Sequence, residues 1–367
     1  MPSGSALSAF SRARVARGLC HRTLQVLGHT GWSKRLPDGR CVRLFALWVM
    51  LTAAWGLTAG AASAAEDVAA YPSRAVTLVV GFAPGGATDV SARLLASKLT
   101  QAFGKPFIVE NRPGANSNIG SRHVVRASPD GYTLLFGTIA NATNMSASSN
   151  NGYDTLRDLI PIVLFMSSPS VLVVNPSLPA RDLQSLIALA KSQPGRLSFA
   201  SSGTGGSTHL AGELLKMREG LNLVHVPYQG AAPAMADVIA GHVQLGFMVS
   251  LGALGPMQKG QLRPLAVAHA RRLAELPDVP TMAEAGLPDF EVSSWNGLAA
   301  PRGTPRPVID KLNAEVNNIL AAPEFARQLQ ALGGHVAGGS SQQFADHVQA
   351  QILKWRDVIR AARITLE

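Results

Sequence analysis

A buried strand that runs straight into a glycine turn and then into a helix constrains this fold more than any other feature. In Val76–Leu95 the β-branched run Val76–Val80 is typical of a strand covered on both faces. Pro84-Gly85-Gly86 then ends the strand. The same order returns where the expected strand Leu197–Ala200 enters the glycine- and serine-rich stretch Ser201–His209. Two such units predict an α/β protein.

The helix after the first glycine turn has an apolar face and a polar start. We expect Thr88 or Asp89 to cap it. Its apolar face is expected to carry Val90, Leu94, Leu95 and Leu99. A helix that opens after a glycine turn presents free N–H groups and a partial positive charge, which suits an anion. One such turn is explained equally well as an ordinary strand-to-helix connection, and the second turn favours an anion site.

The first part of the chain continues as alternating strands and helices. Phe107–Val109 and Tyr132–Gly137 read as strands, and Ile119–Arg126 reads as a helix between them. This alternation predicts a parallel sheet with helices on both faces. Ligands bind such sheets beyond the carboxyl ends of the strands, where Asn116 and the polar loop Thr138–Asn144 are expected.

The middle of the chain repeats the alternation and predicts a second α/β domain. Ile160–Phe165 and Ser170–Val174 are expected as two strands in quick succession, and the further expected strands are Leu197–Ala200, Val224–Val226, Leu245–Val249 and Leu265–Ala268. Its expected helices are Leu183–Lys191, capped by Asp182, then Leu210–Met217 and Ala232–Ala240.

The last part of the chain is too short for a third core. Trp295–Ala299 reads as a strand, and Pro307–Leu320 and Phe344–Ala361 read as helices that pack back onto the first domain. The chain then crosses between the domains twice, near Phe165–Pro169 and near Phe290–Ser294. Two crossings form a hinge, with a ligand cleft between the two lobes.

The N-terminus has the composition of an export signal. Residues 1–64 hold eight arginines or lysines and one aspartate, so most of the net charge of +10 lies there. Arg40 and Arg43 precede the apolar run Leu44–Leu57, and Ala62-Ser63-Ala64 has the form of a cleavage site. We expect a signal peptide with an extended basic region over residues 1–64, cleaved near Ala64. Both cysteines, Cys20 and Cys41, lie within it.

Several functions are disfavoured by the remaining sequence. The expected mature chain is only mildly basic and has no basic run interleaved with aromatic residues, so nucleic acid is not an expected partner. The glycine turns match neither a phosphate-binding loop nor a dinucleotide fingerprint, so no nucleotide cofactor is expected. The histidines show no metal-ligand spacing, and no metal is predicted.

Four polar residues near the glycine turns admit two interpretations each. Asp89 is either a general base or, more in keeping with its place in a first helical turn, a residue that holds the loop N–H groups. His209 forms either a Ser–His pair or a structural hydrogen bond. Tyr228 either closes over a ligand or packs on the surface, and Asn141 either binds ligand or stabilises its loop.

The feature that remains is a pair of glycine and hydroxyl loops, each of which opens a helix. Backbone N–H groups and hydroxyls can bind a carboxylate without an arginine. We therefore predict reversible binding of a small organic anion, with no catalytic residues.

The sequence resembles the Bug, or TctC-like, substrate-binding proteins of tripartite tricarboxylate transporters over essentially all of residues 70–360. The motifs that carry this resemblance, in order, are Phe82-Ala83-Pro84-Gly85-Gly86 with Asp89, Glu110–Ala115, Asp130–Leu135, Ser201-Ser202-Gly203, His209–Glu213, Val226-Pro227-Tyr228, Leu276–Thr281 and Ala299-Ala300-Pro301. Two stretches depart from the family pattern. Asn116-Ser117-Asn118 stands where glycines are usual, and Gln229 stands where a lysine is common.

The resemblance implies an α/β, two-lobed periplasmic binding protein of the type II Venus-flytrap kind, each lobe a mixed, mainly parallel sheet flanked by helices. Lobe 1 is expected to be discontinuous, over residues 65–167 and 293–367, and lobe 2 to cover residues 168–292. It further implies a monomer that binds a small organic carboxylate in the periplasm and delivers it to the permease subunits of the transporter, with no cofactor.

The predicted ligand-binding residues come from both lobes. They are Phe82, Ala83, Pro84, Gly85, Gly86, Asp89, Asn116, Thr138, Asn141, Ser202, Thr204, Gly205, Gly206, Ser207, Thr208 and Tyr228. Two other functions remain open: a periplasmic ligand sensor that feeds a two-component system, and a periplasmic hydrolase that uses His209.

Overall fold

The computed structural model describes residues 70–148 and 150–366. The predicted signal peptide lies outside these residues. The described residues belong to one compact unit. Among the described residues, no helix is both long and apolar enough to cross a membrane.

A mixed sheet runs through the described part of the chain, in the order β2-β1-β3-β9-β4-β7-β5-β6, with β8 and β10 also paired to β4. Its strands are β1 (Val76–Val80), β2 (Phe107–Asn111), β3 (Thr133–Thr138), β4 (Leu159–Val174), β5 (Ser198–Ser201), β6 (Val224–Pro227), β7 (Leu245–Val249), β8 (Arg263–Val267), β9 (Ser293–Pro301) and β10 (His335–Val336).

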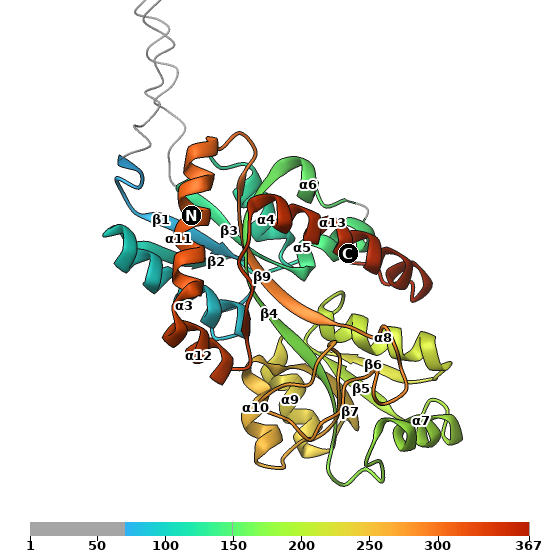
Figure 1. Ribbon diagram of the computed structural model, residues 1–367. Helices are drawn as coiled ribbons and strands as arrows, with labels where there is room; N and C mark the ends of the chain where they lie inside the picture. Colours follow the sequence, from blue (N-terminus) through green and yellow to red (C-terminus); the bar gives the residue numbers. More distant parts are fainter. Residues whose placement is uncertain (1–69, 149, 367) are drawn as a thin grey trace, which may run out of the picture. The chain divides into compact units, whose positions relative to one another are not determined.

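Helices flank this sheet. They are α3 (Ala87–Phe103), α4 (Asn118–Val125), α5 (Ile139–Ala147), α6 (Thr155–Asp158), α7 (Leu183–Ser192), α8 (Ser207–Glu219), α9 (Ala231–Ala240), α10 (Ser250–Gln258), α11 (Arg306–Ala321), α12 (Pro323–Ala331) and α13 (Ser341–Ala361). Figure 1 shows β1, β2 and β3 near α3 and α11, and β5, β6 and β7 near α8 and α9.

Two parallel three-stranded groups are joined by antiparallel strands. In the first group β1 lies between β2 and β3, and in the second β5 lies between β6 and β7. The strands β9 and β4 pair antiparallel with their neighbours. The α/β fold with mixed sheets is confirmed, and its pairing is about evenly parallel and antiparallel rather than mainly parallel.

The strand β4 corrects the predicted organisation of the middle of the chain. Ile160–Phe165 and Ser170–Val174 were expected as two strands, yet one strand covers both. Its first part pairs with β9 as far as Pro169, and its second part pairs with β7 and β8. Pairing with β9 holds Ser167, Ser168 and Pro169 extended, although this composition is typical of a loop. The first predicted crossing near Phe165–Pro169 therefore lies inside a continuous strand (Figure 1).

The two sheet groups are covered by different apolar clusters. β1, β3, α3, α11 and α12 share one cluster, which includes Leu78, Leu95 and Leu312. A second cluster joins α7, α8 and β7 to the terminal helix α13, through Phe199, Leu210, Phe247 and Trp355. The expected packing of the C-terminal part onto the first domain holds for α11 and α12, whereas α13 contacts both α5 and α8.

Three helical predictions need correction. α3 begins at Ala87 with Gly86 as its N-cap, so neither Thr88 nor Asp89 caps it. Val90 was expected on the buried face and is 45% exposed, because the buried face runs through Ser91, Leu95 and Leu99. The stretch expected as the polar loop Thr138–Asn144 instead forms the helix α5.

Candidate functional site

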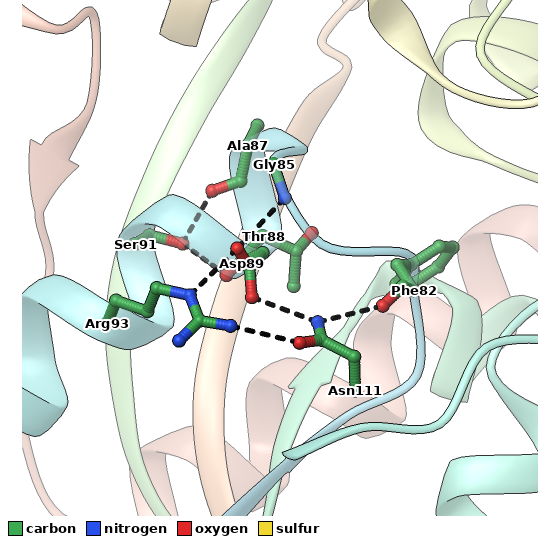
Figure 2. Close-up of polar contacts among 8 residues, drawn as sticks. All are labelled: Phe82, Gly85, Ala87, Thr88, Asp89, Ser91, Arg93 and Asn111. Carbon is green, nitrogen blue, oxygen red and sulfur yellow. Dashed lines mark hydrogen bonds and ion pairs between the residues drawn. The ribbon is translucent and has the colours of Figure 1, made fainter. Parts of the chain in front are cut away.

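The first glycine loop, Phe82–Asp89, is held by the Asp89 side chain. Gly85 has a left-handed φ of 84°, which favours glycine, and Gly86 is the N-cap of α3 without a side-chain cap. Asp89 Oδ2 accepts hydrogen bonds from the Gly85 backbone N–H at 2.9 Å and from Arg93 Nε at 3.0 Å (Figure 2). Its carboxylate thus fixes the loop from one turn into the helix.

Asn111 completes this arrangement from the end of β2. Its Nδ2 donates to Asp89 Oδ1 at 2.9 Å and to the Phe82 carbonyl at 3.0 Å, and Arg93 donates to its Oδ1 (Figure 2). Burial opposes ionisation of Asp89, but the bonds from Arg93, Gly85 and Asn111 outweigh it and hold the pKa of this carboxyl below its ordinary value. Asp89 is therefore ionised, and it holds the Gly85 N–H from the first turn of α3 without capping the helix.

Phe82 is half-buried, whereas Ala83, Pro84, Gly85 and Gly86 are exposed. The first turn of a helix leaves backbone N–H groups without helical partners. Because Asp89 occupies the Gly85 N–H, the donors that loop Phe82–Asp89 offers to an anion are those of the first turn of α3.

The turn before α4 packs against the start of the first glycine loop. Ala115, Asn116 and Ser117 have left-handed φ values of 46°, 48° and 73°. This conformation costs roughly 1 kcal/mol for a residue other than glycine, which gives a physical reason for the glycines usual in the family at Asn116 and Ser117. A Cβ on Gly81 would overlap Ser117, so these two backbones approach closely.

Thr138 and Asn141 form a capping box at the start of α5. The Thr138 hydroxyl accepts from the Ala140 N–H, and Asn141 Oδ1 accepts from the Thr138 N–H at 2.9 Å. Asn141 Nδ2 donates to Ser121 Oγ at 2.7 Å, so this buried amide has internal partners on both atoms.

Asn116 belongs to a network of amides that includes Asn118, Asn144 and Asn151. Asn116 Nδ2 donates to Asn144 Oδ1 at 2.9 Å, and Asn144 Nδ2 donates to Asn118 Oδ1 at 2.7 Å. Asn118 Nδ2 in turn donates to Asn151 Oδ1. The network fixes the position of the Asn116 turn.

The second glycine loop, Ser201–His209, has nearly the same backbone as the first. Gly205 has a φ of 76°, and Gly206 is the N-cap of α8 without a side-chain cap. The Gly205 N–H donates to His209 Nδ1 at 3.1 Å. Thr208 Oγ1 accepts from the Ser202 N–H at 2.9 Å and bonds to the Ser202 hydroxyl at 3.0 Å. Thr204 is half-buried and Ser207 is buried.

His209 lies in a stack of rings behind this loop. Its ring lies 3.8 Å from that of His225, centroid to centroid, and the two planes differ by 8°. His209 Nε2 lies 3.8 Å from Glu213 Oε1, which also accepts from Lys216. Because Nδ1 accepts the Gly205 N–H, the ring proton of neutral His209 is on Nε2, beside Glu213. Burial would raise the pKa of the Glu213 carboxyl, but His209 and Lys216 outweigh it and hold the pKa below its ordinary value.

The hydroxyl–imidazole contact of this region involves His225. Ser201 Oγ lies 2.7 Å from His225 Nε2, whereas His209 Nδ1 is bonded to Gly205. Burial lowers the pKa of His225 to about 4. Ser201 is fully buried, so this pair is a structural contact and does not present a nucleophile to solvent.

Tyr228 follows β6 and is held by Asp237 of α9. Its hydroxyl donates to Asp237 Oδ2 at 2.6 Å, and burial together with this bond raises the pKa of Tyr228 to about 12. Its backbone N–H donates to the Ser201 carbonyl, which places Tyr228 beside the second glycine loop. The neighbouring Gln229 is exposed.

The second glycine loop touches elements that belong to the first sheet group. Thr143 Oγ1 of α5 donates to the Gly205 carbonyl at 3.1 Å. A Cβ on Gly205 would lie 3.2 Å from Asn116 Nδ2. Asn116 therefore lies against the second loop, and its neighbour Ser117 lies against the first.

Sequence reasoning missed two residues here. Asn111 ends β2 within the motif Glu110–Ala115, and its place directly after a buried strand was a signal that could have found it. Asn296 of β9 lies beside Thr138 and is buried. Its sequence context Trp295–Ala299 indicates only a strand.

Comparison with known proteins identifies the family to which this chain belongs. Residues 91–364 match the family TctC, described as the tripartite tricarboxylate transporter family receptor. A protein of R. palustris solved with adipate is 37% identical, with a TM-score of 0.76, and the match covers 80% of this chain and 99% of that one. The periplasmic binding protein BugD is 35% identical, with a TM-score of 0.74 and coverage of 80% and 99%.

A third similar structure is MatC from Rhodopseudomonas palustris with bound malate, which is 32% identical with a TM-score of 0.73 and coverage of 79% and 100%. The chain belongs to the TctC family of solute-binding receptors, which is not a family of enzymes. The resemblance to Bug proteins and the periplasmic-binding-protein fold are thereby confirmed.

Proposed function

We propose that this chain is an exported binding protein that captures a small organic carboxylate and delivers it to the permease subunits of a tripartite tricarboxylate transporter. The observation that carries the proposal is the matched pair of glycine loops. Each begins a long helix at a glycine N-cap without a side-chain cap, and each holds its left-handed glycine through a side chain four residues later. Uncapped first-turn N–H groups and the helix dipole favour an anion.

The binding residues in this proposal are those predicted from the sequence, with different tasks. The exposed or half-buried positions Ala83–Gly86, Ser202, Thr204 and Gly206 would face the ligand, together with the first turns of α3 and α8. Asp89, Thr138, Asn141 and Thr208 would hold the backbone that presents those donors, because their polar atoms have internal partners.

The ligand class is supported by the relatives solved with adipate and with malate, both of which are dicarboxylates. Lobe 1 would comprise residues 65–167 and 293–367, and lobe 2 residues 168–292, with β4 and β9 as the hinge. Residues 1–64 would direct a monomer to the periplasm and be removed near Ala64. Binding would occur without turnover.

A thermal-shift screen of organic acids tests this proposal. The protein is unfolded and refolded to remove any bound acid, and is then heated with adipate, malate and other carboxylates. An acid at 100 times its Kd should add about 2.7 kcal/mol to the free energy of unfolding. The matched control is the diamide of each acid, which keeps the carbon chain and lacks the charge. A screen in which no carboxylate raises the melting temperature more than its diamide would overturn the proposal.

A further inference from the structure

Asn296 of β9 lies beside the cap of α5 and one turn into α3, the helix that opens at the first glycine loop. β9 runs antiparallel to β3, and their register pairs Asn296 with Thr138, the last residue of β3 and the cap of α5. On its other side Asn296 pairs with Met166 of β4. Residues opposite each other in a sheet point to the same face. Because Thr138 is the last residue of β3, Asn296 also lies at the carboxyl end of β3, which is where α/β sheets bind ligands.

The Asn296 side chain also lies beside the beginning of α3. Its Oδ1 lies 3.5 Å from Ser91 Oγ, one turn into the helix that opens at the first glycine loop. The Ser91 hydroxyl has nearer acceptors in the carbonyls of Ala87 and Thr88, at 2.9 and 3.0 Å. Because a hydroxyl carries one hydrogen, the long contact to Asn296 adds little, and Ser91 does not depend on it.

The Asn296 amide is therefore buried without adequate partners. The residue is 4% exposed, and its Nδ2 has no hydrogen-bond partner among the described residues. Rotating the amide by 180° would exchange its two ends and still leave one end unpartnered. The buried amides of Asn141, Asn144 and Asn118 differ in this respect, because all three have close internal partners. A buried amide donor without a partner is costly to keep and needs an explanation.

We infer that Asn296 is a ligand-binding residue whose Nδ2 donates to an oxygen of the organic acid bound at the start of α3. This inference rests on the proposed function. The Asn296 amide would add a neutral side-chain donor to backbone donors that are not specific for one acid. An amide at a fixed position selects acids that place an oxygen within its reach. The unpartnered donor then serves affinity at the expense of the stability of the unliganded protein.

The variant Asn296→Leu tests this role, because leucine has a similar shape and no polar atoms. We expect it to weaken the Kd by about ten-fold or more, as for loss of a hydrogen bond to a charged group. We also expect the unliganded protein to melt at the same or a higher temperature, because an unsatisfied buried donor has been removed. The Kd is measured by calorimetric titration with the acid that gave the largest stabilisation in the screen of adipate, malate and other carboxylates.

Asn317→Ala is the matched control. Asn317 lies on α11, and both ends of its side-chain amide are hydrogen-bonded to the Gly339 backbone. Loss of this amide should lower the melting temperature and leave the Kd unchanged. Asn296→Ala provides a second variant if leucine prevents folding, and it should also weaken the Kd.

The inference is overturned if the wild type binds an acid and both Asn296 variants bind it equally well. It is also overturned if the Asn296 variants behave as Asn317→Ala does, with a lower melting temperature and an unchanged Kd. In both results the proposed function stands. A wild type that binds no acid overturns both.

Discussion

The two glycine loops share a backbone and differ in the side chain that holds it. Gly85 and Gly205 are both left-handed, and the N-caps Gly86 and Gly206 have φ and ψ values of −79° and 168°, and −77° and 167°. In each loop a side chain four residues after the left-handed glycine accepts its N–H. That acceptor is the carboxylate of Asp89 in the first loop and the imidazole of His209 in the second.

The loop geometry therefore requires a hydrogen-bond acceptor four residues after the left-handed glycine, but it does not require a charge there. Asp89 brings a negative charge that Arg93 and Asn111 compensate. His209 accepts as a neutral ring and stacks on His225. The two loops therefore present similar backbone donors over different electrostatic surroundings, and they should respond differently to mutation and to acid.

The largest effect is expected from Asp89→Ala. The change removes a carboxylate that is 3% exposed and accepts three hydrogen bonds, so it leaves Gly85, Arg93 and Asn111 without their acceptor. We expect a loss of about 3 kcal/mol in the free energy of unfolding, at the lower end for a broken buried pair because Arg93 is half exposed. Urea denaturation measures it.

Asp89→Asn is the control for this change, because it keeps the shape and offers one acceptor oxygen to three donors. It should destabilise less than alanine does. If Asp89→Ala unfolds at the same urea concentration as the wild type, Asp89 does not hold the first loop.

The next effect is a dependence of the free energy of unfolding on pH, caused by His225, which contacts Ser201 of the second loop. The pKa of His225 is about 4 in the folded protein, against an ordinary value of 6.5. Between these values the unfolded chain binds a proton that the folded chain does not, so stability falls as the pH is lowered from about 6.5 to about 4. Because the His225 ring is only partly buried, we expect a loss of roughly 2 kcal/mol in the free energy of unfolding.

His225→Phe should make the stability profile less steep in this pH range, because phenylalanine can stack and cannot titrate. A smaller slope should remain, since burial also lowers the pKa of His335 and of His347. The folded pKa of Asp89 is below its ordinary value, so the stability it contributes is lost only at lower pH, as the carboxylate is protonated. A wild-type profile that is flat from pH 6.5 to pH 4 would contradict the assignment.

A smaller effect is expected for His209→Ala. The Gly205 N–H is left without its acceptor, and the ring contact with His225 is lost. Together these losses should lower the free energy of unfolding by about 1.5 kcal/mol. His209→Asn can present an oxygen near the position of Nδ1 and should recover part of this loss. Equal stability of the alanine and asparagine variants in thermal denaturation would show that the acceptor at this position is not needed.

The smallest effect distinguishes the two left-handed glycines. Gly85→Ala meets no atom within 4 Å and should cost about 1 kcal/mol for the backbone conformation alone. Gly205→Ala would also press on Asn116 and Leu366, at 3.2 and 3.4 Å, and should cost roughly 0.5 kcal/mol more. Matched urea denaturation curves measure this difference, and a larger cost at Gly85 would contradict it.

The structural features that could be predicted from the sequence are those encoded by neighbouring residues. A β-branched run, a glycine pair and an apolar helical period lie within twenty residues of each other in Val76–Leu95, so the first loop could be found without any tertiary information. Ser201–His209 could be found for the same reason.

The parts that could not be predicted depend on distant segments. The continuity of β4 through Ser168-Pro169 comes from β9, more than a hundred residues later. The Pro113-Gly114 pair predicts a turn before α4, but the left-handed backbone continues through Ala115, Asn116 and Ser117, which contain no glycine to signal it. Asn296 looks like any polar residue of a strand, and its unpartnered amide becomes visible only when β3 and α3 lie beside it.

An NMR titration of the 15N-labelled protein with the acid selected in the screen tests directly whether both glycine loops bind the same ligand. If both loops bind one carboxylate ligand, the backbone amides of Ala87–Asp89 and of Ser207–His209 should shift together, with one Kd. Shifts confined to one loop at saturation, with the amides of the other unchanged, would contradict the account.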